Sequence, residues 1–145
     1  MNKIELLKAK RDGLKIKDDI NRFAKEGWES ISEEDIHRLK WYGLFLRNPT
    51  PGFFMLRVRI PNGFSSSHQV RALACIAEIY GNGVIDITTR QQVQLRHLKI
   101  ENIPQVFDLI EEMGLTTSQT GMDNVRNIMG CPVAGLNPKE RVDAY

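Results

Sequence analysis

The stretch FFMLRVRI, residues 53–60, alternates apolar side chains with others along its whole length. Its even-numbered positions are all apolar, whereas Arg57 and Arg59 occupy odd-numbered positions. Successive side chains of a β-strand point to opposite faces of the sheet. The pattern therefore predicts a strand with one buried face and one basic face.

The residues that follow this strand carry, in order, a helical spacing, two short β-rich runs and a second helical spacing. We expect these elements at residues 65–81, 84–88, 93–98 and 102–114. The two short runs are expected to pair as a hairpin, and Asn102 with Gln105 has the pattern of a capping box. One more strand within residues 115–120 completes the order β-α-β-β-α-β, an α+β fold of the ferredoxin-like type.

The residues that precede the strand favour helices. Apolar residues at 16, 20, 23 and 24 share one helical face that ends near Gly27, and Ser32 is placed to open a second helix. The turn NPTPG, residues 48–52, separates this portion from the strand. We therefore expect an N-terminal helical segment at 1–48, a ferredoxin-like half-domain at 53–120 and a further segment at 121–145.

Composition excludes several classes of protein. With 145 residues, 41% of them hydrophobic and 26% charged, the chain is expected to fold as a soluble globular protein. A formal net charge of +2 gives no general attraction for nucleic acids or membrane surfaces, and no apolar run is long enough to span a bilayer. The charged N-terminus is unlike a secretory signal, so the sequence predicts a cytoplasmic protein, or one of the plastid stroma if it comes from a plant.

Cysteine and histidine offer little for metal binding. Cys75 and Cys131 lie outside any C-x-x-C motif, and the three histidines, His37, His68 and His97, make no metal-ligand spacing. We therefore predict no metal site within this chain. An iron–sulfur cluster would need thiolates from elsewhere.

Arginine prevails among the basic residues between positions 49 and 130, where it accounts for six of seven. Planar guanidinium groups suit two-pronged hydrogen bonding to carboxylates and similar anions. In the strand expected at 93–98, period-two geometry places Gln94 and Arg96 on the face opposite Val93, Leu95 and His97.

Four side chains are therefore expected to project together from the face of the sheet that the helices leave open: Arg57, Arg59, Gln94 and Arg96. Asp86 is the nearby acid on these strands. Arg90 and Arg126 are placed to add donors at the rim. Positive charges gathered with so few acids favour a bound anion.

RNA binding is a competing interpretation, because RNA-recognition domains share this order of strands and helices and Phe53 and Phe54 lie beside basic residues. The runs at 84–88 and 93–98, however, carry no aromatic residue, and the net charge is close to zero. The sequence therefore favours a smaller anion over a nucleic acid.

Three motifs resemble those of a known family. FMLRVRIPNG at 54–63, TTRQQVQLR at 88–96 and GMDNVRN at 121–127 are similar in wording, order and spacing to the N-terminal half of the sirohaem-dependent nitrite and sulfite reductases. Arg96 after Gln-Leu, and the string QTGMDNVRN at 119–127, look more like ferredoxin-dependent assimilatory nitrite reductase, because sulfite reductases tend to carry histidine where Arg96 stands. A sulfite reductase fragment is the alternative.

The resemblance implies an activity and a set of site residues. Members of the family carry out the six-electron reduction of nitrite to ammonium in nitrate assimilation. Ferredoxin, the partner, donates electrons that pass through a [4Fe–4S] cluster to sirohaem. The matching positions imply that Arg57 and Arg126 are catalytic and reach the bound nitrite, while Arg59 is only a neighbour of a functional position. They imply cofactor contacts, to the carboxylates or the macrocycle of sirohaem, from Arg90, Gln94, Arg96 and Asn127.

The chain also departs from the family. The cluster cysteines of the family, spaced C-x5-C and C-x3-C, and its distal lysines come from a later part of a much longer sequence and have no counterpart here. We therefore expect residues 121–145 to begin a truncated sirohaem-domain segment and the chain to be inactive alone, with a tendency to self-associate. A stand-alone module that binds a tetrapyrrole or an anion is the second alternative.

Overall fold

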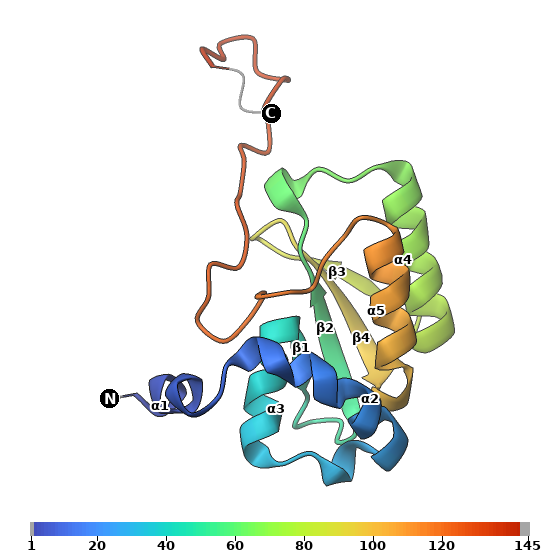
Figure 1. Ribbon diagram of the computed structural model, residues 1–145. Helices are drawn as coiled ribbons and strands as arrows, with labels where there is room; N and C mark the ends of the chain where they lie inside the picture. The colour runs from blue at the N-terminus through green and yellow to red at the C-terminus, as the bar shows by residue number, and fades with distance from the viewer. Residues whose placement is uncertain (1, 143–145) are drawn as a thin grey trace.

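The computed structural model describes residues 2–142 and is built on one four-stranded antiparallel sheet (Figure 1). The strands lie in the order β1-β2-β4-β3. Their bounds are Leu44–Leu46 for β1, Phe53–Val58 for β2, Ile85–Ile87 for β3 and Val93–Lys99 for β4. The predicted strand at 53–60 and the predicted hairpin are confirmed, and so is the ferredoxin-like α+β fold.

Two helices pack on one face of the sheet, α4 at Ser67–Tyr80 and α5 at Ile103–Glu112 (Figure 1). Helix α4 begins at Ser66 with a complete capping box made with Gln69, which stabilises a helix start by about 1 kcal/mol. The capping box expected at Asn102 is wrong. Asn102 makes no side-chain cap, because it closes a 3-10 turn and has helical backbone angles itself.

Three helices precede the sheet: α1 at Lys3–Lys10, α2 at Lys17–Glu26 and α3 at Glu33–Leu39. The predicted end of α2 at Gly27 and the predicted cap of α3 by Ser32 are both confirmed. Short 3-10 turns link the elements, at Gly13–Ile16, Trp28–Ser30, Lys40–Tyr42, Pro61–Gly63 and Ile100–Asn102. Within residues 2–142, no helix has the length and apolar character needed to cross a membrane.

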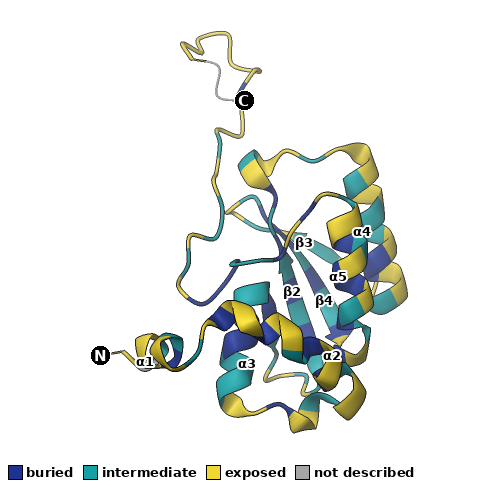
Figure 2. Cartoon of the chain, viewed as in Figure 1, coloured by how far each residue is buried: buried dark blue, intermediate teal, exposed yellow. Residues whose placement is uncertain are grey.

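The N-terminal segment shares one hydrophobic core with the half-domain (Figure 2). Ile16, Phe23 and Leu39 are buried in the same cluster as Phe54 and Leu95. The turn at 48–52 therefore marks a change of secondary structure within one packed unit. It is also not the start of the sheet, because β1 lies before it, at residues 44–46 of the segment 1–48 that was expected to be helical.

The last strand expected at 115–120 is also wrong. Only one isolated bridge forms there, between Arg59 and Thr116. The side of β2 that this strand would take is already occupied by β1, whose Leu44, Phe45 and Leu46 pair with Leu56, Met55 and Phe54. Residues 117–130 instead run irregularly past the ends of the strands, and we call this segment the strap.

A β-bulge shifts the register of β4 and overturns the face expected for His97. Phe54 pairs with Leu98 but Leu56 pairs with Leu95, so β4 carries an extra residue between these pairs. His97 has a positive φ of 61° and its ring contacts Phe53, with ring centroids 5.6 Å apart. Leu98, not His97, continues the buried row of Val93 and Leu95, as the extra residue of a bulge requires.

Candidate functional site

The candidate anion site lies where the end of β2, the turn between β3 and β4, and the strap come together. Two backbone hydrogen bonds join the residues after β2 to the strap and to the residue before it: Asn62 N–H donates to the Ile128 carbonyl (2.8 Å), and Arg59 N–H donates to the Thr116 carbonyl (2.8 Å). Residues that are far apart in sequence thus line one edge of the sheet.

Arg57 is partly buried. It projects from β2 beside Gln94, its register partner on β4. Its Nη1 donates to the Thr120 carbonyl (3.0 Å), and its guanidinium carbon lies 4.8 Å from the centroid of the Phe45 ring. Its Nε is buried and has no hydrogen-bond partner among residues 2–142. A buried donor without a partner is costly, and a ligand oxygen would satisfy it.

Positive charge is concentrated around Arg57. Burial lowers the pKa of Arg57, and the nearby charges of Arg126 and Arg90 lower that pKa further. Like charges disfavour one another in this way when no opposite charge stands between them. The guanidinium stays protonated near neutral pH. The repulsion among the three arginines would therefore be relieved by an anion bound among them.

Arg90 and Arg126 line a cavity of about 280 Å³ together with Asn124, Asn127 and Met129. Within the described part of the chain, Arg90 forms no ion pair, and Arg126 has one long contact to Asp123 (3.9 Å). That aspartate is 61% exposed, so water weakens the interaction. Both guanidinium groups are thus left with donors to offer to an anion.

Arg96 has a different environment from Arg57. Its Nε donates to the carboxylate of Asp86, and its Nη2 lies 3.5 Å from Gln94 Oε1. Asp86 and Arg57 flank Gln94 in one row across three strands. The acid noted in the sequence is therefore the ion-pair partner of Arg96.

Arg59 points to the strap and does not join Arg57 as a free donor. Its Nε donates to the Arg126 carbonyl (3.0 Å), and its Nη2 donates to the carbonyls of Gln119 and Val125 (both 3.2 Å). The expectation that four side chains project together from one open face is thus wrong for Arg59, whose donors bind the backbone of the strap.

Asn127 uses its amide nitrogen to join three segments. Nδ2 donates to the carbonyls of Ile60 (2.9 Å) and Arg90 (3.0 Å), and lies 3.4 Å from that of Gln91. Its Oδ1 is buried without a partner among residues 2–142. The side-chain oxygen Oδ1 is therefore the atom of Asn127 that is left to bind a ligand. Because it is a hydrogen-bond acceptor, it can bind a donor group of a ligand but not an anion.

Sequence reasoning missed two glutamines at the turn before β4. Gln92 is 1% exposed, and its Nε2 donates to the Arg126 carbonyl (2.7 Å). Gln91 exchanges two hydrogen bonds with Gly130, donating to its carbonyl and accepting from its N–H (both 3.0 Å). In the sequence these residues are visible only as two amide side chains directly before a strand. That pattern does not indicate which groups they bind.

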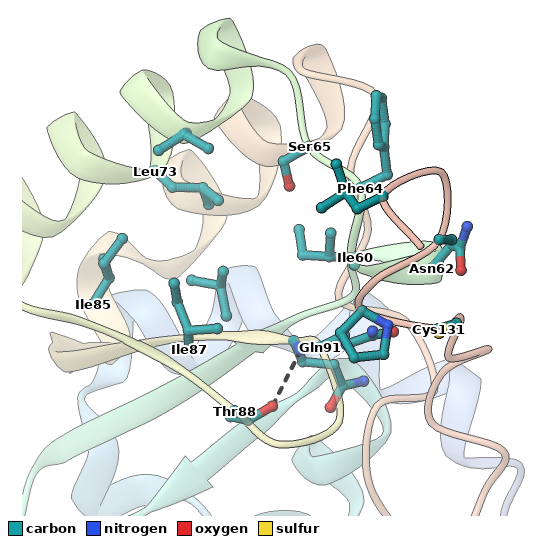
Figure 3. Close-up of a pocket in the computed structure, with 17 residues that line it drawn as sticks. Ile60, Asn62, Phe64, Ser65, Leu73, Ile85, Ile87, Thr88, Gln91 and Cys131 are labelled. Atoms are coloured by element: carbon teal, nitrogen blue, oxygen red, sulfur yellow. Dashed lines mark hydrogen bonds between the residues drawn. The ribbon is translucent and has the colours of Figure 1, made fainter. Parts of the chain in front are cut away.

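A larger cavity of about 490 Å³ lies between α4, β3 and residues 131–136 (Figure 3). Its lining includes Ile60, Leu73 and Ile87 and contains no charged side chain. Cys131 lies at its edge and is exposed. Among residues 2–142, no group of three or more histidine, cysteine or acidic side chains is arranged to hold a metal ion.

Comparison with known proteins gives the following similarities. Residues 47–113 match the family described as the nitrite/sulfite reductase ferredoxin-like half domain. The chain is 51% identical over 145 residues to a ferredoxin–nitrite reductase of Leptolyngbya laminosa, covering 99% of this chain and 28% of the relative. It is 41% identical to the chloroplastic ferredoxin–nitrite reductase of Spinacia oleracea, covering 99% of this chain and 26% of the relative.

A solved structure has the same fold. The Mycobacterium tuberculosis NirA protein superimposes with a TM-score of 0.89 at 30% sequence identity, covering 98% of this chain and 29% of that one. The chain thus spans little more than a quarter of the length of each of these proteins.

Proposed function

We propose that the chain is the N-terminal portion of a ferredoxin-dependent nitrite reductase, because its residues 47–113 belong to the nitrite/sulfite reductase ferredoxin-like half-domain family. The observation that carries this proposal is the group formed by Arg57, Arg90 and Arg126: Arg90 and Arg126 line one cavity, and burial together with their nearby positive charges lowers the pKa of Arg57. In this function the group holds anionic parts of the substrate and the cofactor.

The donor set fits the carboxylates of sirohaem. Guanidinium groups bind carboxylates by paired, charge-assisted hydrogen bonds, and Arg57 Nε is a buried donor without a hydrogen-bond partner in the described part of the chain. Arg90 would hold cofactor carboxylates, with Gln94 beside Arg57 as a neutral donor. Asn127 supports this arrangement through the Arg90 carbonyl. Sirohaem, when bound, supplies the redox chemistry.

The described residues do not fit the [4Fe–4S] cluster. Such a cluster takes four thiolates, whereas the chain has only Cys75 and Cys131, both exposed. Cluster ligands must therefore come from outside residues 2–142, and the proposal includes that the chain alone is inactive. Self-association of the chain stays a prediction.

Arg57 and Arg126 are proposed to contact nitrite. Their guanidinium groups donate hydrogen bonds to its oxygens and stabilise negative charge that builds up as it is reduced. Because Arg57 is held by the Thr120 carbonyl and the Phe45 ring, its donors are oriented before the anion arrives. Preorganised donors of this kind need no reorganisation at the moment of reaction.

The proposed function is tested by assaying the complete protein that contains this chain, with reduced ferredoxin as donor and nitrite or sulfite as substrate. We expect ammonium from nitrite at a kcat/KM at least tenfold above that for sulfite, and no turnover by residues 1–145 alone. Faster formation of sulfide would establish the sulfite reductase alternative.

A ferredoxin partner and a location in the cytoplasm or plastid stroma agree with cyanobacterial and chloroplastic relatives.

A stand-alone module that binds a tetrapyrrole or an anion is the second candidate, because the arginine group lies entirely within this chain. Titration of residues 1–145 with sirohaem, followed by absorption spectroscopy, distinguishes the two. Tight, stoichiometric binding favours the module. Weak binding by the chain, together with tight binding by the complete protein, favours the reductase.

Asp86→Asn is expected to tighten the binding of sirohaem to the complete apoprotein about two- to fivefold. Asp86 neutralises Arg96, and a cofactor carboxylate must displace it before Arg96 can bind that carboxylate. The pair is partly exposed, at 31% and 38%, so the competition is worth no more than about 1 kcal/mol. The dissociation constant is measured by titration at fixed salt.

Asp108→Asn on the exposed side of α5 is the matched control, because it removes the same charge from a residue that takes no part in the Asp86–Arg96 ion pair. We expect no change in its dissociation constant. Weaker binding by Asp86→Asn would show instead that Asp86 orients Arg96 for the cofactor.

A further inference from the structure

Arg126 lies in a part of the strap that packing does not hold in place. Its neighbours Val125 and Ile128 are 82% and 76% exposed, so neither anchors the segment by burying apolar surface. The segment also belongs to no helix or strand. Its position must therefore come from hydrogen bonds that other parts of the chain make to it.

Two side chains converge on the backbone carbonyl of Arg126. Gln92 Nε2 donates to it at 2.7 Å, and Arg59 Nε donates to it at 3.0 Å. Arg59 comes from just beyond β2 and Gln92 from the turn before β4, so the carbonyl oxygen is held from two directions.

Gln92 is itself rigidly placed. Its N–H donates to Thr88 Oγ1 (3.1 Å), and its carbonyl accepts from Thr88 N–H (2.9 Å). With 1% of its surface exposed, its amide has little freedom to choose another partner in water. The short hydrogen bond from Gln92 to the Arg126 carbonyl therefore fixes the strap relative to the turn before β4.

The turn that Gln92 closes also carries Arg90. The Arg90 carbonyl accepts from Asn127, the residue that follows Arg126. Each of the two arginines that line the cavity is therefore held, through its own carbonyl, by a side chain from the segment that carries the other. These two reciprocal hydrogen bonds fix the distance between the turn before β4 and the strap.

We propose that Gln92 is a positioning residue for the anion site, which holds the Arg126 guanidinium where it can act together with Arg57 and Arg90. The proposal rests on the proposed function, in which Arg126 contacts the anion. A neutral amide suits this task because it supplies a strong donor and adds no further positive charge to the three arginines.

The test is a double-mutant cycle in the complete enzyme, using Gln92→Met, Arg126→Ala and the double variant. Methionine keeps the length of glutamine and removes the donor. We expect Gln92→Met alone to lower kcat/KM for nitrite about tenfold at unchanged sirohaem content, because small displacements of a positioned group are costly. In the Arg126→Ala background we expect less than a twofold further loss.

Gln105→Met, on the exposed side of α5, is the control for glutamine replacement and is expected to keep the parent kcat/KM. If Gln92→Met does not fold, Arg59→Lys takes its place in the cycle, because Arg59 reaches the same carbonyl. The same lack of additivity is then expected.

The outcomes separate the two proposals. Equal losses from Gln92→Met in both backgrounds, or no loss in either, would overturn the positioning role while leaving the site intact. Unchanged kcat/KM in Arg126→Ala alone would refute the proposed function of Arg126, and the positioning role with it.

Discussion

Replacing Arg126 by alanine in the complete enzyme is expected to lower kcat for nitrite by about two to three orders of magnitude, the usual cost of removing a donor from developing charge. Sirohaem content is expected to fall far less. The reason is that the Arg126 side chain makes only one long contact within the described chain, to the exposed Asp123. Its guanidinium therefore contributes charge to the cavity and little to the fold. Steady-state kinetics and the sirohaem absorbance of the purified variant measure the two quantities.

Arg71→Ala is the matched control for this experiment. Arg71 is exposed on α4 and takes no part in the arginine group, so the variant is expected to keep both its rate and its sirohaem. Parent-like rates in Arg126→Ala would exclude a catalytic role for Arg126. A loss of rate in proportion to a loss of sirohaem would make Arg126 a cofactor ligand instead.

Replacing Gly43 by alanine is expected to lower the free energy of unfolding of the 145-residue chain by about 3 kcal/mol. Gly43 has a φ of +74°, and the left-handed region costs a residue with a Cβ about 1–2 kcal/mol. The new Cβ would also lie 2.6 Å from the Arg57 carbonyl oxygen, and such overpacking costs a further 1–3 kcal/mol or so. Relief by movement is blocked, because Arg57 N–H donates to the Gly43 carbonyl (2.9 Å).

Gly83→Ala separates the two causes. Gly83 has a similar φ of +75°, but an added Cβ there meets nothing within 4 Å. We expect it to lose only the conformational part, about 1 kcal/mol. Urea unfolding of both variants gives the comparison. Equal losses of unfolding free energy in the two variants would mean that steric contact between a Cβ at position 43 and β2 does not destabilise the fold.

Much of the secondary structure could be predicted because its signals are local. The start of α4 rests on Ser66 and Gln69, three positions apart, and the end of α2 on Gly27. The prediction of β2 rests on an alternation that is visible within the eight residues 53–60. Local hydrogen bonds and side-chain direction need no information from the rest of the chain.

The failures share a different cause. A strand within residues 115–120 is expected because it would complete the β-α-β-β-α-β order, but pairing requires a free partner, and β1 already occupies that side of β2. His97 was placed on the wrong face because an extra residue in one strand is defined only against its neighbour. Both errors concern which strands meet and in which register.

The sequence was enough to single out the arginines as candidates for an anion site, since six of the seven basic residues in this region are arginine and only one acid is near. It was not enough to assign each arginine its partner. Arg59 donates to the backbone carbonyls of residues 119, 125 and 126, and Arg96 pairs with Asp86. The Nε of Arg57 is a buried donor without a partner in the described part of the chain. These differences depend on atoms that come within about 3 Å only after separate segments have packed together: strands ten residues apart for Arg96, and segments sixty or more residues apart for Arg57 and Arg59.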